Sequence, residues 1–302
     1  MKADSGVKGH VSALITILIW GTTFISTKIL LPDFKPIEIL FYRFCIGLFV
    51  LSIVYPHRLK GTTKRQELLL VAAGLCGITL YYLLENIALT YTAASNVGVI
   101  ICITPFFTAL LANWLLEGEK PKANFFIGFL SAIVGISLIS FNGSMVLQLD
   151  PVGDVLALLA SVVWAVYSIL TRKISQFGYN TIQTTRRVFC YGLLFMLPVL
   201  FLMGFEWGIE RFARTANTFN MLFLGLCASA LGFVTWNLAV KILGAIKTSI
   251  YIYLTPVVTI VTSVIVLSER ITWMSALGTV LTLAGLFISE ERFSIMAKRQ
   301  VK

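Results

Sequence analysis

The chain has 302 residues, of which 58% are hydrophobic and 13% are charged, and its mean hydropathy is +0.88. A soluble domain carries roughly a quarter charged residues, so this composition excludes an ordinary soluble domain and favours a membrane protein. The formal net charge of +10 would also suit a nucleic-acid-binding protein, a class that the placement of the cations argues against.

Apolar spans of about 20 residues follow one another along the whole chain, with short connections between them. The first span is longer and more polar than a secretory signal peptide and lacks a small-residue cleavage site, so we expect it to be retained. The sequence therefore predicts an all-α integral membrane protein with ten transmembrane helices. The ten spans cover residues 11–31, 36–55, 68–90, 95–116, 123–142, 152–171, 182–203, 217–240, 246–267 and 272–289.

Lysine and arginine are distributed unevenly between the two sides of this topology. With the amino terminus in the cytoplasm, the cytoplasmic segments hold sixteen of these residues and the opposite segments hold five. Cytoplasmic loops carry an excess of Lys and Arg, so we expect a multi-pass protein of the plasma (cell inner) membrane with both termini in the cytoplasm. The positive charge then reflects topology and attraction to the lipid bilayer, and no nucleic-acid partner is expected.

The second half of the chain repeats the first. Residues 74–108 align with residues 225–259 at a constant offset of 151, and eleven of the 35 pairs are identical. Nearer the amino terminus, an offset of 144 places Trp20 on Trp164. Because the repeated unit holds five helices, an odd number, the second copy must enter the membrane from the opposite side.

We therefore expect two inverted five-helix repeats around a central cavity, the first over residues 1–145 and the second over residues 146–302. Inverted repeats of this kind mark secondary transporters, which bind substrate near the middle of the membrane. Alternating access between the two sides of the membrane is the expected mechanism.

The chain resembles EamA-type members of the drug/metabolite transporter superfamily. The resemblance is carried by the opening SALITILIWGTTFISTK (residues 12–28) and by the ITP and LTP motifs at residues 103–105 and 254–256. It implies that spans 1–4 and 6–9 surround the cavity and that spans 5 and 10 pack outside it. It also implies export of a small organic metabolite, with amino acids or related zwitterions as the expected class. A multidrug or sugar-type carrier of the same fold is the alternative, and a channel is a weaker one.

Pro105 and Pro256 lie near the middle of the fourth and ninth spans, at equivalent positions of the repeat. Proline inside a helix removes a hydrogen bond and clashes with the preceding turn, at a cost of about 3 kcal/mol. The carbonyls of Ile101 and Ile252, four residues earlier, are expected to lose their helical partners. Two interpretations remain open: a kink that shapes the cavity and flexes during transport, or a static bend required for packing.

Polar and aromatic residues recur every three or four positions in the first, sixth and ninth spans, which places them on one face of each helix. Aligned stripes in repeat-related helices favour cavity lining, whereas a single Thr usually bonds back to its own helix. Asn86 and Asn237 are repeat mates that either bind substrate or tie helices together. The residues expected at the cavity are Trp20, Thr23, Tyr82, Glu85, Asn86, Thr104, Trp164, Tyr167, Trp236, Asn237, Tyr251 and Thr255.

Glu85 is the only carboxylate well inside a span, and Arg43 lies at a similar depth in the second span. Intramembrane acids usually pair with a base or face the protein interior. Two interpretations of Glu85 stay open: a structural ion pair with Arg43, or a site that gains and loses a proton and so couples transport to protons. Arg186 and Arg187, near the cytoplasmic face, either hold a substrate carboxylate or extend to lipid headgroups.

No cofactor and no metal site is expected. The five cysteines lie inside spans without a CxxC motif, and the two histidines lie at loop edges. The nucleotide-binding pattern GxxxxGK[ST] does not occur. An enzyme would require a constellation of reactive groups in the spans, where Glu85 stands alone, so no enzyme is expected. A small-molecule substrate and a monomer or weak oligomer complete the prediction.

Overall fold

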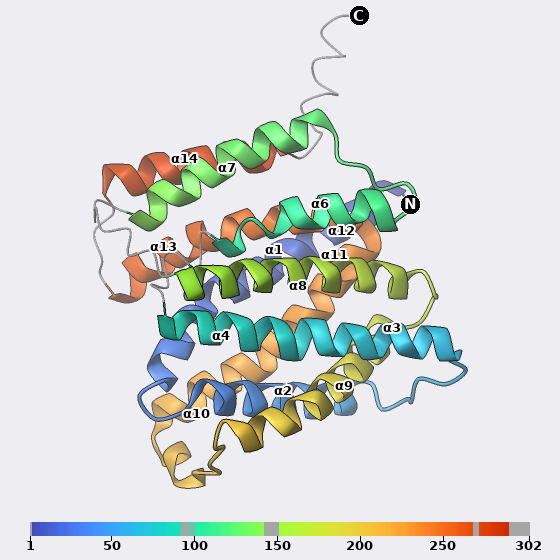
Figure 1. Cartoon of the computed structure of the whole chain (residues 1–302), viewed down its shortest axis with the longest axis vertical. Helices are drawn as coiled ribbons and strands as arrows, with labels where there is room; N and C mark the ends of the chain where they lie inside the picture. Colours follow the sequence, from blue (N-terminus) through green and yellow to red (C-terminus); the bar gives the residue numbers. More distant parts are fainter. Residues whose placement is uncertain (1, 92–96, 98–99, 142–150, 268–271, 290–302) are drawn as a thin grey trace, which may run out of the picture.

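The computed structural model describes residues 2–91, 97, 100–141, 151–267 and 272–289, and every regular element within these residues is helical. The α-helices are α1 (Lys2–Leu30), α2 (Pro36–Val54), α3 (Lys64–Gly74), α4 (Tyr81–Tyr91), α6 (Thr104–Leu115), α7 (Ala123–Phe141), α8 (Pro151–Ser175), α9 (Thr181–Leu202), α10 (Thr215–Leu222), α11 (Gly232–Leu243), α12 (Ala245–Ser249), α13 (Leu254–Leu267) and α14 (Trp273–Ser289). Figure 1 shows many of these helices side by side, with their ends gathered at two opposite sides of the bundle.

Apolar helical runs account for most of the described chain. Six of them are long and apolar enough to cross a membrane, and three shorter apolar helices accompany them. These runs fall on nine of the predicted spans; the remaining span, 95–116, includes residues outside the described part, and α6 covers its later portion. A helix satisfies its own backbone hydrogen bonds, which lipid requires. The predicted all-helical class is confirmed, whereas the inverted arrangement stays a prediction.

α7 and α14 pack against each other through glycines at one edge of the bundle (Figure 1). A Cβ atom on Gly128 would lie 2.4 Å from the carbonyl oxygen of Gly285, and one on Gly135 would lie 2.5 Å from that of Gly278. Because the residue number rises in one helix as it falls in the other, the two helices run antiparallel. Backbones that approach this closely need residues without a side chain.

Two π-helical segments interrupt the third and eighth predicted spans. Leu75–Leu80 links α3 to α4, and Phe223–Leu231 links α10 to α11. The repeat offset of 151 places residues 75–80 on residues 226–231, so both halves carry the irregularity at the same position. π-helical turns are rare and occur frequently at functional sites. The apolar pattern of these spans did not predict them.

The two spans that contain Pro105 and Pro256 are broken rather than smoothly bent. In the first half, residues 102–103 form a turn, and α6 then begins with Pro105 in its first turn. In the second half, the 3₁₀ segment Ile250–Tyr253 separates α12 from α13. The hydroxyl of Thr104 donates to the carbonyl of Ile101 at 2.5 Å, so the carbonyl that Pro105 deprives of a donor has a new one. Flexing at these breaks remains a prediction.

Candidate functional site

Tryptophan, tyrosine and phenylalanine rings from α1, α8 and α11 meet inside the bundle. The ring centroid of Trp20 lies 5.4 Å from that of Trp164 and 5.3 Å from that of Trp236. Tyr167 lies 5.0 Å from Trp164, and Phe233 lies 5.6 Å from Trp20. We call these five residues the aromatic cluster. Four predicted cavity residues are thus brought together, and in this conformation their rings contact one another.

The indole nitrogens of the aromatic cluster differ in their hydrogen bonding. Trp20 Nε1 donates to the carbonyl of Ala228, in the second π-helical segment, at 3.0 Å. Trp236 Nε1 is buried and has no hydrogen-bond partner among the described residues. A buried donor without an acceptor costs about 1–3 kcal/mol, so such groups call for an explanation. An acceptor on a bound molecule is one explanation, which makes Trp236 a candidate ligand contact.

Tyr81 and Tyr82 extend the aromatic cluster along α4. The ring centroid of Tyr81 lies 4.6 Å from that of Trp164 and 4.9 Å from that of Tyr82. The hydroxyl of Tyr81 donates to Glu85 Oε1 at 3.1 Å. Predicted cavity residues Tyr82 and Glu85 therefore lie beside the aromatic cluster, and Tyr81 connects them to it.

Arg43 and Glu85 do not form the ion pair that the sequence left open. Arg43 Nε donates to Ser229 Oγ at 2.9 Å, and the guanidinium carbon lies 5.1 Å from the centroid of the Tyr82 ring. Glu85 has Tyr81 as its hydrogen-bond donor, and no ion pair joins it to Arg43 among the described residues. Ser229 belongs to the second π-helical segment, Phe223–Leu231, and the sequence did not predict this contact.

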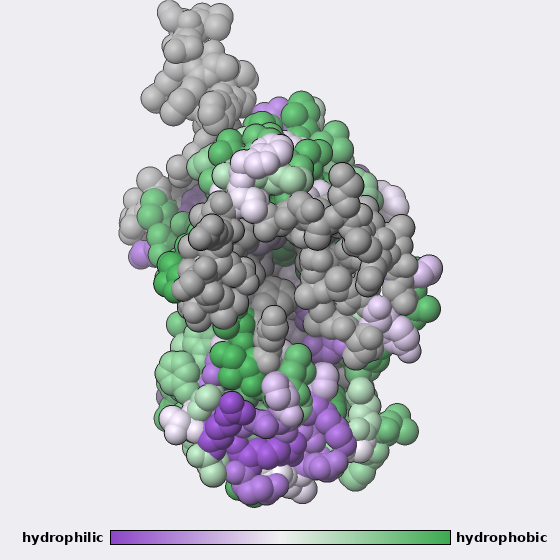
Figure 2. Space-filling view, turned by 90° about the vertical axis from the view of Figure 1, so that its left-hand side faces the viewer, coloured by the Kyte–Doolittle hydropathy of each residue, from purple (hydrophilic) through white to green (hydrophobic). Residues whose placement is uncertain are grey.

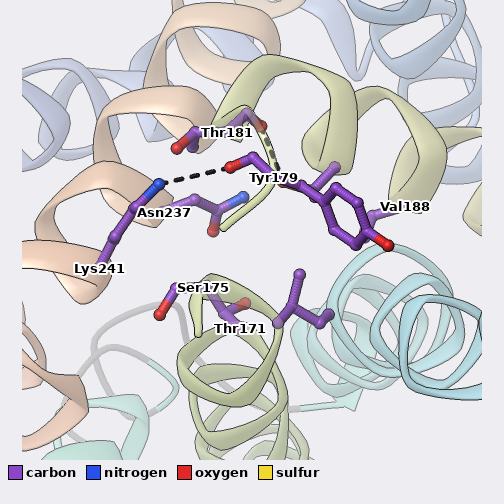
Figure 3. Close-up of a pocket in the computed structure, with 9 residues that line it drawn as sticks. Thr171, Ser175, Tyr179, Thr181, Val188, Asn237 and Lys241 are labelled. Carbon is purple, nitrogen blue, oxygen red and sulfur yellow. Dashed lines mark hydrogen bonds between the residues drawn. The ribbon is translucent and has the colours of Figure 1, made fainter. Parts of the chain in front are cut away.

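Asn237 ties three helices together and also lines a pocket. Its Oδ1 accepts from the hydroxyl of Tyr167 at 2.9 Å, and its Nδ2 donates to Thr185 Oγ1 at 2.9 Å. Figure 3 shows the pocket between α8, α9 and α11, where Lys241 Nζ donates to the carbonyl of Tyr179 at 3.3 Å. The pocket lies at the predicted cytoplasmic end. Its other lining residues are Thr171, Ile174, Ser175, Thr181, Thr184 and Val188.

Asn86, the repeat mate of Asn237, lies in a different pocket between α2 and α4. No residue of the aromatic cluster lines this pocket, so Asn86 does not share one cavity with the tryptophans as the sequence predicted. The two pockets are nevertheless equivalent: the offsets that place Asn86 on Asn237 also place Ile37 on Thr181. One is lined mainly by polar residues and the other by apolar ones. The other residues of the second pocket are Pro36, Leu40, Leu83, Ile87 and Met203.

Two of the three threonines predicted at the cavity donate hydrogen bonds to backbone carbonyls of their own spans. Thr23 Oγ1 donates to the carbonyl of Trp20 at 2.7 Å, and Thr104 donates to Ile101 as described above. Their hydroxyls therefore bond within their own spans rather than face an open cavity, which is the usual role of Thr in membrane helices. Thr255 lies in the first turn of α13, where its carbonyl oxygen would be 3.3 Å from a Cβ on Gly21 of α1.

Tyr251 contacts α1 instead of the aromatic cluster. Its hydroxyl lies 2.6 Å from His10 Nδ1, and the two residues are 241 positions apart in the chain. No local spacing in the sequence relates His10 to Tyr251, so this contact was not predicted. The contact joins the first helix of one half to the interrupted helix of the other.

A polar cluster closes the predicted outer end, where Figure 2 shows hydrophilic residues gathered at the lower part of the face. Arg211 Nη1 donates to Glu38 Oε2 at 2.8 Å, and the Glu38 side chain is fully buried. Asp33 Oδ2 accepts from Asn217 at 2.7 Å and pairs with Arg214 at 3.0 Å. The hydrogen bond from Asn217, aided by Arg214, lowers the pKa of Asp33 below its ordinary value. We call these five residues the outer cluster.

A second polar cluster closes the predicted cytoplasmic end. Arg186 donates to the carbonyls of Tyr55 and His57 at 2.6 and 2.7 Å. Arg187 Nε pairs with Glu67 Oε1 at 2.7 Å. Both arginines therefore bind groups of the first half, and the two interpretations of their role stay predictions. We call these five residues the inner cluster.

Glu119 provides another link between the halves. Its Oε2 accepts from the backbone N–H groups of Ala245 and Ile246 at 2.7 and 3.3 Å, at the start of α12. Its Oε1 lies 2.5 Å from Arg172 Nε of α8. A first-half carboxylate thus caps the helix that leads into the break of the second half.

Several known proteins resemble this chain along its whole length. The family model described as the EamA-like transporter family matches residues 7–141 and again residues 151–290. An uncharacterized transporter of Archaeoglobus fulgidus is 28% identical over 93% of this chain and 97% of its own. A probable terminal-alkyne amino-acid exporter of Streptantibioticus cattleyicolor is 27% identical over 92% of both chains. One crystal structure, 18% identical, matches with a TM-score of 0.79 over 100% of both chains and shows the shared fold.

Proposed function

Because this chain belongs to the EamA-like transporter family, we propose that it exports a small organic metabolite across the plasma membrane by alternating access. The chain is a multi-pass membrane transporter, and the observation that carries the proposal is the match of the family model to both halves. An amino acid or a related zwitterion is the proposed substrate class. Both termini are proposed to lie in the cytoplasm.

The proposed architecture is a pair of inverted five-helix halves, residues 1–145 and 146–302. The antiparallel packing of α7 on α14 supports it, because equivalent helices of inverted halves run in opposite directions. The π-helical segments and the helix breaks at equivalent positions support it as well.

Alternating access is supported by where the two polar clusters lie. The outer cluster joins the start of α2 to the connection between α9 and α10. The inner cluster joins the start of α9 to the segment between α2 and α3. α2 and α9 are repeat-related helices. At each end of the bundle, the start of one of them is therefore linked to the segment that follows the other. We propose that each transport step breaks one cluster and keeps the other, because water must reach the centre from one side at a time.

The substrate class is supported by two features. The aromatic cluster offers apolar ring surface for a side chain, and Trp236 Nε1 offers a donor without an acceptor among the described residues. The name of the relative from Streptantibioticus cattleyicolor refers to an amino acid. Proton coupling stays part of the proposal through Glu85, the buried carboxylate beside this cluster.

Counterflow in proteoliposomes tests the proposal. Vesicles that contain the purified chain and are loaded with a panel of unlabelled amino acids should accumulate the matching radiolabelled amino acid transiently and saturably. Conductance without counterflow would instead indicate a channel, and chemical conversion of the added compound would indicate an enzyme. Counterflow of sugars or cationic drugs alone would replace the proposed substrate class and retain the carrier.

A further inference from the structure

Two opposite charges are buried beside the aromatic cluster without neutralising each other. Arg43 is 5% exposed and Glu85 is 9% exposed. Neither has a partner of opposite charge among the described residues, and each contacts a different member of the Tyr81–Tyr82 pair. Removing an ion from water without pairing it is expensive, so this arrangement calls for a compensating ligand.

Both groups retain unused hydrogen-bonding capacity. A guanidinium has five N–H donors; Arg43 directs Nε to Ser229 and another donor toward the hydroxyl of Tyr82, and its other donors have no partner among the described residues. A carboxylate has two acceptor oxygens, and among the described residues Glu85 has a donor at Oε1, from Tyr81, and none at Oε2. The unused atoms of these two residues are not among the polar atoms that the protein buries completely without a partner. A small molecule that reaches these atoms can pair with the remaining donors and the remaining acceptor.

We propose that Arg43 and Glu85 bind the two charges of one zwitterionic substrate, Arg43 its carboxylate and Glu85 its ammonium group. This inference rests on the proposed function and assigns residues to its substrate class. A carboxylate matches the planar fork of the guanidinium, and an ammonium group donates to the free carboxylate oxygen. The bound zwitterion would neutralise both protein charges while the site gains no net charge.

The rings define where the rest of such a substrate goes. Tyr81 contacts both Glu85 and Trp164, so a substrate held at Glu85 has the aromatic cluster beside it. An aromatic or large apolar side chain would bury its surface against these rings. L-phenylalanine is therefore the probe that fits best, and its derivatives remove one charge at a time: L-phenylalaninamide lacks the carboxylate, and N-acetyl-L-phenylalanine lacks the ammonium group.

Calorimetric titration of the purified full chain in detergent tests this inference without relying on transport. The wild-type chain should bind L-phenylalanine at least about tenfold more tightly than either derivative, because each derivative leaves one buried charge unpaired. Equal affinity for all three compounds, or no binding of L-phenylalanine, would overturn the inference. Counterflow of another solute would in that case leave the proposed carrier function standing. Selective binding of L-phenylalanine without any counterflow would support the inferred roles of Arg43 and Glu85 and contradict the proposed carrier function.

Substitutions then assign each charge. Arg43→Gln should weaken binding of L-phenylalanine about tenfold and leave binding of L-phenylalaninamide unchanged. Glu85→Gln should also weaken binding of L-phenylalanine about tenfold, but should leave binding of N-acetyl-L-phenylalanine unchanged. The exposed Arg58→Gln and Glu117→Gln serve as matched controls and should not change any of the three affinities. Uniform losses for all three compounds in both variants would contradict the assignment. The wild-type series remains decisive if either variant fails to fold.

Discussion

Trp20 and Trp164 occupy equivalent positions of the two halves, and their rings pack edge to face with centroids 5.4 Å apart and planes at 76°. Two residues related by a two-fold axis contact each other only where that axis passes close to both. In the fifth and tenth spans an offset of 150 places Gly128 on Gly278, Gly135 on Gly285 and Ser131 on Leu281. Ser131 and Leu281 are also in contact, because Ser131 Oγ donates to the carbonyl of Leu281 at 3.1 Å. An axis through both pairs would relate the proposed inverted halves.

The two central indoles predict a difference in stability. Trp20→Phe and Trp236→Phe remove similar volumes, but only Trp20 loses a hydrogen bond, the one to Ala228. We expect Trp20→Phe to lower the free energy of unfolding by about 1 kcal/mol more than Trp236→Phe does. Thermal unfolding of both variants in the same detergent, without substrate, measures the difference. A greater loss in Trp236→Phe would show that its indole nitrogen has a partner.

The contact between α7 and α14 predicts intolerance to a single methyl group. In Gly135→Ala the new Cβ would lie 2.5 Å from the carbonyl of Gly278, so the two helices must separate. We expect a loss of about 1–3 kcal/mol in the free energy of unfolding, as for other overpacked sites.

Gly6→Ala is the matched control for this prediction. Gly6 is also helical, and a Cβ there meets no atom within 4 Å, so the change should be neutral or slightly stabilising. A Gly135→Ala chain as stable as the Gly6→Ala chain would show that α7 and α14 can separate without cost.

Much of the fold follows from the sequence because hydrophobicity and repetition are encoded locally. Apolar length predicts the helices, and the offset of 144 relates Trp20 to Trp164 before any coordinates are seen. The predicted stripes of the first and sixth spans bring Trp20 and Trp164 to the aromatic cluster, whereas Trp236 comes from the eighth span, for which no stripe was predicted. Such signals specify which helix face is turned inward.

The remaining site features depend on contacts that no spacing encodes. The π-helical turn that brings Ser229 to Arg43 depends on how apolar helices pack, and its residues resemble those of any span. Among the described residues Arg43 bonds to Ser229, and the ion pair that one interpretation of Glu85 required is not formed. The pairing of Tyr251 with His10 likewise spans the whole chain. Depth along a helix was predictable, whereas the partner of each charged group was not.

The outer cluster predicts a dependence on acidic pH. Because Asp33 has a lowered pKa in the folded chain, its ionised form stabilises the fold above the ordinary carboxyl pKa of about 4, and this contribution is lost as the pH falls through the folded value. Hydrogen exchange of the connection between α9 and α10 should therefore accelerate in acid. Asp33→Asn should show faster exchange already at neutral pH and a weaker pH dependence. An unchanged pH profile in Asp33→Asn would assign the acid sensitivity to another carboxylate.

The helix breaks predict a kinetic effect. Pro105→Ala and Pro256→Ala should each favour a continuous helix and slow counterflow more than they weaken substrate binding, if the breaks move during transport. Exchange rates and binding affinities measured on the same preparations separate the two effects. Wild-type exchange rates in both variants would mean that the breaks only serve packing.

Glu85→Gln separates the three roles that its position allows. A structural ion pair would make the substitution cost about 3–5 kcal/mol, because Arg43 would be left uncompensated. The structure favours a smaller cost, since the Gln carbonyl can still accept from Tyr81 and Arg43 keeps Ser229. If Glu85 binds the substrate ammonium, counterflow of L-phenylalanine should weaken about tenfold at every pH. If Glu85 instead exchanges a proton, counterflow should persist while uptake driven by a pH gradient is lost. Unfolding, counterflow and gradient-driven uptake measured on one Glu85→Gln preparation decide among these outcomes, and wild-type values in all three would leave Glu85 without a role in transport.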